Sequence, residues 1–184
     1  MAPHDGPQQW TEPTDKLTRS GKGVFEAPKS PYDLWMEAQD IPIYRDIGVS
    51  KVQNLPMKPW KMMGGSATFI QLYGTEGMWG CHVLEVPGAG ALNPIKHMYE
   101  QQYFVVEGRG STEVWEEGRE DKIHVFEWQK GSLFSLPLNT MYRVVNASSA
   151  PALLLGGNTA PNAMNIYDSS DFIFNCPYTF RERF

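Results

Sequence analysis

Eight short apolar runs between Ala67 and Leu155 constrain the fold of this sequence more than any other feature. Each run is rich in Val, Ile, Phe, Tyr and Trp, and Gly, Pro, Asn or Ser residues typical of turns lie between the runs. The runs cover residues 67–73, 79–86, 102–107, 111–116, 123–128, 133–136, 141–146 and 151–155. Short strands repeated at roughly 8- to 12-residue spacing predict an antiparallel β-sandwich or barrel. We therefore expect an all-β domain over residues 66–160.

The segment before this domain, residues 1–65, predicts an arm. Residues 1–30 are rich in Pro, Gly, Asp and Thr and indicate an extended piece, in which His4 is a bystander. A short helix is expected over about residues 31–39, because Ser30 suits an N-cap and Pro31 the first helical position. The rest of the arm indicates a linker with short strand pieces.

The expected helix has an apolar face, and two further short segments indicate local structure. Leu34, Trp35 and Ala38 would lie on the buried face of the helix. Gly156-Gly157 indicates a bend in the barrel. After the domain, residues 161–184 predict a C-terminal strand and tail, with Phe172-Ile173-Phe174 as the strand.

Charge and composition exclude several classes of function. The net charge is −5 and no long Lys/Arg run occurs, so neither a nucleic-acid partner nor an anionic membrane surface is expected. No apolar stretch reaches the roughly 20 residues of a spanning helix, and the N-terminus lacks the apolar region of a secretory signal. Cys81 and Cys176 lie far apart and indicate two buried thiols in a reduced compartment. These features predict a cytoplasmic protein.

Two stretches carry the residues with useful chemistry, GALNPIKHMYEQQYFVVEG (90–108) and GSLFSLPLNTMYRVVN (131–146). In an unbroken strand every second residue from Ile95 to Val105 shares one face, which places His97, Gln101 and Tyr103 together. Glu100 would join them only if a bulge moved the register by one residue.

These two stretches resemble the two sequence motifs of the cupin superfamily. The resemblance implies a cupin-type antiparallel β-barrel with a helical N-terminal arm. It puts Ile95, His97, Gln101 and Tyr142 at the positions of the three histidines and one glutamate that hold a metal in such barrels. His97 alone is a strong ligand, because Gln is a neutral donor and Tyr binds as phenolate only with a depressed pKa. The cofactor would be one divalent Fe, Mn, Ni or Zn held by His97, Gln101 and Tyr142, and the absence of any cofactor is an equal alternative.

Each candidate residue has a functional and a structural interpretation. His97, Tyr142 and Glu100 are the catalytic candidates, His97 as metal ligand or general base. The substrate-binding candidates are Tyr103, Gln101 and His82. The structural alternatives are a hydrogen-bonded interior His97, a wall residue Tyr142 and a packed strand histidine at His82.

The order of the helix, a KPW segment, a FIQL strand and a cupin motif also resembles the N-terminal half of two-cupin proteins related to gentisate-type dioxygenases. That resemblance implies a degenerate barrel, with a second cupin beyond Phe184. Two functions follow as hypotheses. The first is an oxygenase-type enzyme, or half of one, acting on a small oxygenated or aromatic molecule. The second is a non-catalytic module for ligand binding or assembly, most simply as a homodimer.

Overall fold

The computed structural model describes residues 28–75 and 77–180, so most of the predicted extended arm and His4 lie outside the described residues. The secondary-structure elements follow one another in a fixed order along the chain. They are α2 (Pro31–Ala38), β1 (Ile43–Asp46), η2 (Val52–Asn54), β2 (Lys58–Trp60), β3 (Gly65–Leu72), β4 (Gly80–Val86), β5 (Gln101–Glu107), β6 (Arg109–Trp115), β7 (His124–Gln129), β8 (Leu133–Leu136), β9 (Met141–Asn146), β10 (Ala152–Asn158), α3 (Ala160–Tyr167) and α4 (Ser170–Asn175). The eight strands predicted between residues 67 and 155 are confirmed as β3 to β10, with ends that differ by a few residues.

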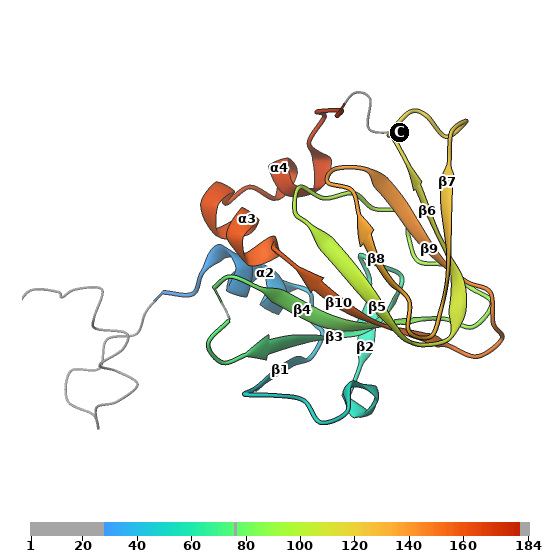
Figure 1. Cartoon of the computed structure of the whole chain (residues 1–184). Helices are drawn as coiled ribbons and strands as arrows, with labels where there is room; N and C mark the ends of the chain where they lie inside the picture. Colours follow the sequence, from blue (N-terminus) through green and yellow to red (C-terminus); the bar gives the residue numbers. More distant parts are fainter. Residues whose placement is uncertain (1–27, 76, 181–184) are drawn as a thin grey trace, which may run out of the picture. The chain divides into compact units, whose positions relative to one another are not determined.

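The strands form two sheets that face each other (Figure 1). The seven-stranded sheet has the order β1-β3-β4-β10-β5-β8, and β2 pairs with β3 beside that path. The three-stranded sheet has the order β7-β6-β9. The paired strands among β2 to β10 are antiparallel, whereas β1 runs parallel to β3. The strand pieces that the sequence placed in the arm therefore join the edge of the larger sheet.

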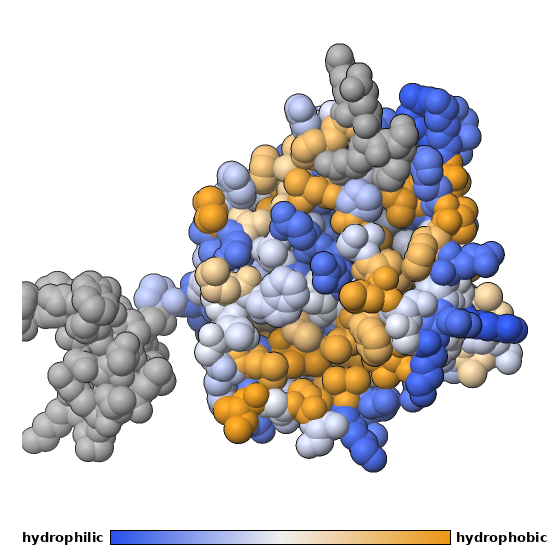
Figure 2. Space-filling view, viewed as in Figure 1, coloured by the Kyte–Doolittle hydropathy of each residue, from blue (hydrophilic) through white to orange (hydrophobic). Residues whose placement is uncertain are grey.

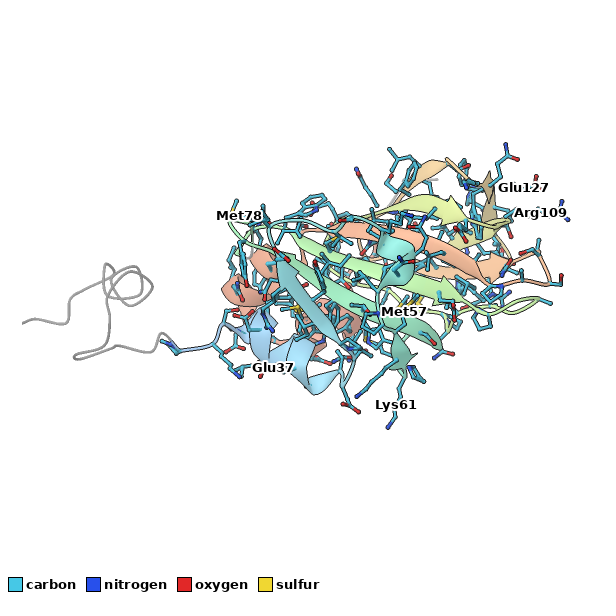
Figure 3. All side chains as sticks on the ribbon, turned by 90° about the horizontal axis from the view of Figure 1, so that it is seen from below. Glu37, Met57, Lys61, Met78, Arg109 and Glu127 are labelled. Carbon is cyan, nitrogen blue, oxygen red and sulfur yellow. The ribbon has the colours of Figure 1, made fainter. Side chains whose placement is uncertain are left out.

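The main hydrophobic core lies between the sheets, because alternate residues of each strand point inward. Leu84, Val105, Val144 and Leu154 are fully buried in this core. Figure 3 shows side chains filling the space between the sheets, while charged residues such as Glu37 and Arg109 project outward. The interior is consequently packed with side chains from both sheets.

The helix of the arm occurs as predicted, but its buried face was predicted wrongly. Tyr32 and Met36 are buried in the core, whereas Leu34 and Ala38 are exposed and Trp35 is half-buried. Tyr32 and Met36 are four residues apart and share one helix face. A hydrogen bond from the Tyr32 backbone N–H to the Asn165 side chain, 3.0 Å long, joins the start of this helix to α3.

Two predictions about the C-terminal part are also corrected. Residues 172–174 belong to the helix α4 and not to a strand, because Ser169 caps this helix by accepting a hydrogen bond from the Phe172 backbone N–H. Gly156 and Gly157 lie inside the strand β10 and not in a bend. At Gly156 any Cβ would come within 2.5 Å of the His82 ring, so the glycine provides room for a neighbouring side chain.

The outer face of the seven-stranded sheet carries a second, smaller apolar cluster. Ile70, Val83, Val106 and Leu153 belong to it, and Leu55 from the segment 49–57 covers one part. Figure 2 shows apolar residues across the lower part of the visible face, where β3, β4 and β5 run. Within the described residues, no helix is both long enough and apolar enough to cross a membrane.

Candidate functional site: a closed histidine–tyrosine core

Four polar aromatic side chains meet inside the barrel. His82 comes from β4, Tyr103 from β5 and Tyr142 from β9, and His97 lies in the segment that leads into β5. Each is at most 3% exposed to solvent. Alternation along β4 and β5 turns His82 and Tyr103 inward with Leu84 and Val105. The structure therefore brings together four of the residues that the sequence selected.

These four side chains form a hydrogen-bonded chain. His82 Nε2 lies 3.3 Å from the Tyr103 hydroxyl, and His97 Nε2 lies 3.3 Å from the Tyr142 hydroxyl. The two tyrosine hydroxyls interact with each other and so connect the two pairs. At the far end, His97 Nδ1 lies 2.9 Å from the backbone carbonyl of Tyr99. The chain thus runs from one histidine to the other through two hydroxyls.

The backbone carbonyl at one end fixes the tautomer of His97. A carbonyl oxygen only accepts, so His97 Nδ1 donates to Tyr99 and the neutral ring accepts at Nε2. Tyr142 then donates to His97. His97 is consequently the neutral tautomer that carries its proton on Nδ1.

Burial holds both histidines in the neutral form. It lowers the pKa of His97 from 6.5 to about 4, although the hydrogen bond to the Tyr99 carbonyl opposes the shift. Burial, together with a smaller contribution from the nearby His97, also lowers the pKa of His82 from 6.5 to about 4. The pKa of Tyr142 is raised well above 10 by burial, so its hydroxyl keeps the proton. The core is uncharged near neutral pH.

Gln101 lies near this chain, with its side chain engaged by other groups. Its amide nitrogen donates to the backbone carbonyls of Gln102 and Gly157, at 2.7 Å and 3.3 Å. Its amide oxygen accepts from Asn158 Nδ2 at 3.2 Å. These bonds fix the amide beside Gly156, where a Cβ would come within 2.9 Å of its nitrogen.

Glu100 is not brought to the other candidates. It is exposed, and its carboxylate accepts a hydrogen bond from the Thr159 hydroxyl. The bulge that could have turned it inward lies farther along β5, where the pairing with β10 shifts between Leu153 and Leu154. That shift leaves both Val105 and Val106 buried and does not reach Glu100, which precedes β5.

Sequence reasoning missed two residues that shape this core. Tyr99 stacks on the His97 ring with a centroid distance of 3.8 Å and an interplanar angle of 2°. Trp60 from β2 meets His82 edge-on at 5.6 Å. Tyr99 carries a usable signal, because it shares the alternating face of His97 and Gln101. Trp60 carries none, because its position depends on the pairing of β2 with β3.

The residues at the four predicted ligand positions do not fit a transition metal. Ile95 has no donor atom, both nitrogens of His97 face hydrogen-bond partners, and the Gln101 amide is engaged. The raised pKa of Tyr142 disfavours the phenolate that would bind a cation. The described residues also contain no cluster of three or more His, Cys, Asp or Glu side chains suited to a metal. We therefore derive no chemical step through a metal.

The same residues fill the barrel and do not line the hollows found at the surface. Four hollows lie at the surface of the described part of the chain. The first is bordered by α2, α3 and α4, the second by β6 and β7, the third by residues 94–96, and the fourth by β7 and β8. His82, His97, Gln101, Tyr103 and Tyr142 border none of these four. The arrangement can share protons internally and connect the two sheets.

The lowered histidine pKa values predict how stability depends on pH. The unfolded chain takes up protons near pH 6.5 and the folded chain near pH 4, so the free energy of unfolding should fall as pH drops through this window. Each histidine should contribute a slope of up to about 1.4 kcal/mol per pH unit. Urea unfolding between pH 7 and pH 4.5 would measure it for wild type and His97→Gln. His97→Gln should have a smaller slope than wild type. His124→Gln, at an exposed position, is the control and should keep the wild-type slope. Equal slopes in all three proteins would contradict the account.

The donor set also predicts the metal content. Protein purified without a His-tag and incubated with Fe, Mn, Ni or Zn salts should hold far less than one metal per chain after desalting. His97→Ala should have the same low content, since the ring already uses both nitrogens. Elemental mass spectrometry gives the measurement. Near-stoichiometric metal that disappears in His97→Ala would show that this core opens to bind a cation.

Comparisons with known proteins locate the fold. No protein-family profile and no curated protein sequence matches the chain. Among solved structures, an oxalate oxidase in complex with the substrate analogue glycolate superposes with a TM-score of 0.50 and 16% identity over 62% of this chain and 60% of that chain. The cupin domain of Schizosaccharomyces pombe Cnp3 gives 0.48 and 14% over 63% and 71%.

The Lactobacillus farciminis oxalate decarboxylase formate complex gives a TM-score of 0.49 and 16% identity over 59% of this chain. The chain spans only 32% of the length of that decarboxylase and 60% of that of the oxidase. Likeness at this identity concerns the fold alone. The two facing sheets, their strand order and the superposition on the oxalate oxidase together show a jelly-roll β-barrel of the cupin type.

Proposed function

We propose that this chain is a non-catalytic cupin module whose role is assembly, and that it pairs with a second copy through the outer face of the seven-stranded sheet. The observation that carries the proposal is a row of directly paired residues across that face. Thr68, Val83, Leu155, Phe104 and Leu133 are cross-strand partners from β3 to β8.

Exposure increases along this apolar row. Thr68 and Val83 are fully buried, and the Thr68 hydroxyl donates to the backbone carbonyl of Pro56 in the covering segment 49–57. Phe104 is 44% exposed and Leu133, on the edge strand β8, is 64% exposed. An uncovered apolar row that ends on an edge strand without Lys or Pro favours association.

Charge favours a second copy as the occupant. The chain carries a net charge of −5, so two copies repel each other overall. This repulsion is weakest where the two surfaces in contact carry few charged side chains. On one side of the apolar row the outward residues are Gln102 and Ser135, and on the other they include Glu107 and Glu85. A two-fold axis along the row sets the acidic side of one copy against the uncharged side of the other.

The interior supports a non-catalytic role. An oxygenase-type enzyme needs side-chain donors free to bind a metal or substrate, and the donors of this barrel are bonded to one another. The buried histidine–tyrosine chain instead connects β4 and β5 of one sheet to β9 of the other. A rigid barrel of this kind is a suitable base for an outer contact surface.

A single charge on the apolar row tests the proposal. Wild-type protein should run at twice the 20.8 kDa chain mass in size-exclusion chromatography with light scattering. Leu133→Glu should weaken dimerisation by about 100-fold or more, because each copy then loses a buried leucine and gains a charge at the contact. Leu133 is exposed in the single chain, so the variant should keep the wild-type thermal midpoint at concentrations low enough for both proteins to be monomeric.

The matched control is Ile166→Glu, which places the same charge on α3 at an apolar side chain that is 73% exposed. It should remain dimeric. A wild type that is monomeric at about 100 μM protein, or a Leu133→Glu variant as dimeric as the control, would contradict assembly through this face.

A further inference from the structure

The C-terminal segment of residues 168–178, here called the strap, lies against the segment that carries His97. It contains α4 and continues to Tyr178 without further regular structure. The Met98 backbone N–H donates to the Ile173 carbonyl at 2.8 Å. Ile173 is 1% exposed, so the strap is seated on the core at this point.

Two polar side chains of the barrel hold the strap by its backbone. Asn139 Nδ2 donates to the carbonyls of Cys176 and Tyr178, at 3.2 Å and 2.6 Å. Lys96 Nζ donates to the same Cys176 carbonyl at 2.8 Å. Both partners of Asn139 are acceptors, which settles the orientation of its amide.

Asn139 is placed for this contact by the turn between β8 and β9. Its backbone φ is +55°, a left-handed conformation that asparagine tolerates better than most residues. Its own N–H donates to the His97 carbonyl at 2.9 Å, which joins the turn to the His97 segment. Its side-chain oxygen is buried without a hydrogen-bond partner among the described residues. The hydrogen bonds of the Asn139 side chain are therefore those that its nitrogen donates to the strap.

The strap also covers His97 through a series of rings. Tyr99 stacks on His97, and Phe174 of α4 meets Tyr99 edge-on with a centroid distance of 6.3 Å. Trp35 of α2 stacks against Phe174 at 6.0 Å. The burial of His97 on this side thus depends on two rings, of which the outer belongs to the strap.

The strap is less firmly packed than the strands below it. Phe174 borders two separate hollows, one with Trp35 and Met164 and the other with Met62 and Ile95. The helix α4 has only six residues, which is too short to be stable on its own. Elements with incomplete packing and few bonds are those that open locally while the remainder stays folded.

We infer that the strap is a releasable cover over the His97 end of the barrel, held closed by Asn139 and Lys96. Its release uncovers Tyr99 and the ring of His97 without unfolding the two sheets. This device is independent of the proposed assembly, which uses β5 and β8 on the outer face. A failure of either proposal leaves the other standing.

Cys176 provides a direct probe of strap release, because it lies in the strap and is 7% exposed. In a Cys81→Ser background of the full chain, its reaction with 5,5′-dithiobis(2-nitrobenzoate) should be slow. Asn139→Gly keeps the left-handed turn and removes two hydrogen bonds, so the rate should rise about tenfold. Lys96→Met keeps the aliphatic stem and should give a smaller rise. Lys58→Met, which removes an exposed pair with Asp40, is the control and should leave the rate unchanged.

The dependence on urea distinguishes local release from unfolding. Below the unfolding transition, the rate in Asn139→Gly should rise far less steeply with urea than global unfolding does, because release of the strap exposes only a small part of the buried surface. Modification of His97 by diethyl pyrocarbonate, located by mass spectrometry, should rise in parallel. Equal Cys176 rates in all variants, or rates that rise with urea as steeply as global unfolding, would overturn the inference. Faster Cys176 reaction without faster His97 modification would also overturn it.

Discussion

The hydrogen-bonded chain from His82 through Tyr103 and Tyr142 to His97 is the interaction on which the rest of this structure depends. It crosses the interior from the seven-stranded sheet to the three-stranded sheet, where apolar packing alone would not fix the partners. A buried polar group without a partner costs about 1–3 kcal/mol, so each hydroxyl and ring nitrogen in the chain constrains its neighbours. Gly156 and Tyr99 adapt to it, one by omitting a side chain and the other by stacking.

The polar groups inside the barrel are bonded to one another, so contacts with a partner would form on the outside of the barrel. Where the ligands of a metal-binding cupin would converge, this chain has an aliphatic residue, an engaged amide and two hydrogen-bonded rings. The outer face of the larger sheet, in contrast, has an apolar row that is buried at β3 and exposed to solvent at β8. The proposed release of the strap would open the interior on the side of His97, where a ring of α4 completes the cover. The proposed assembly and the proposed release would therefore use different parts of one fold.

The sequence predicted most of the strands of the fold, but only part of the arrangement of the site. Alternating runs and turn residues set the strands β3 to β10, because a strand with one buried face shows its period of two directly. The exposed Leu34 and the helical Phe172–Phe174 were misjudged, because short apolar segments fit a helix and a strand equally well and their burial depends on tertiary contacts. The inward set His97, Gln101 and Tyr103 follows from the same alternation. Their bonding does not, because the Tyr103–Tyr142 contact joins strands of different sheets.

The most direct test of the closed core is the protonation state of its two histidines. Long-range ¹H–¹⁵N NMR spectra of the full chain at pH 6 distinguish the two neutral tautomers from each other and from the charged ring. The account predicts that both rings are neutral, with the proton of His97 on Nδ1. A charged ring at pH 6, a His97 proton on Nε2, or a His97 signal that shifts on addition of Zn²⁺ would contradict it.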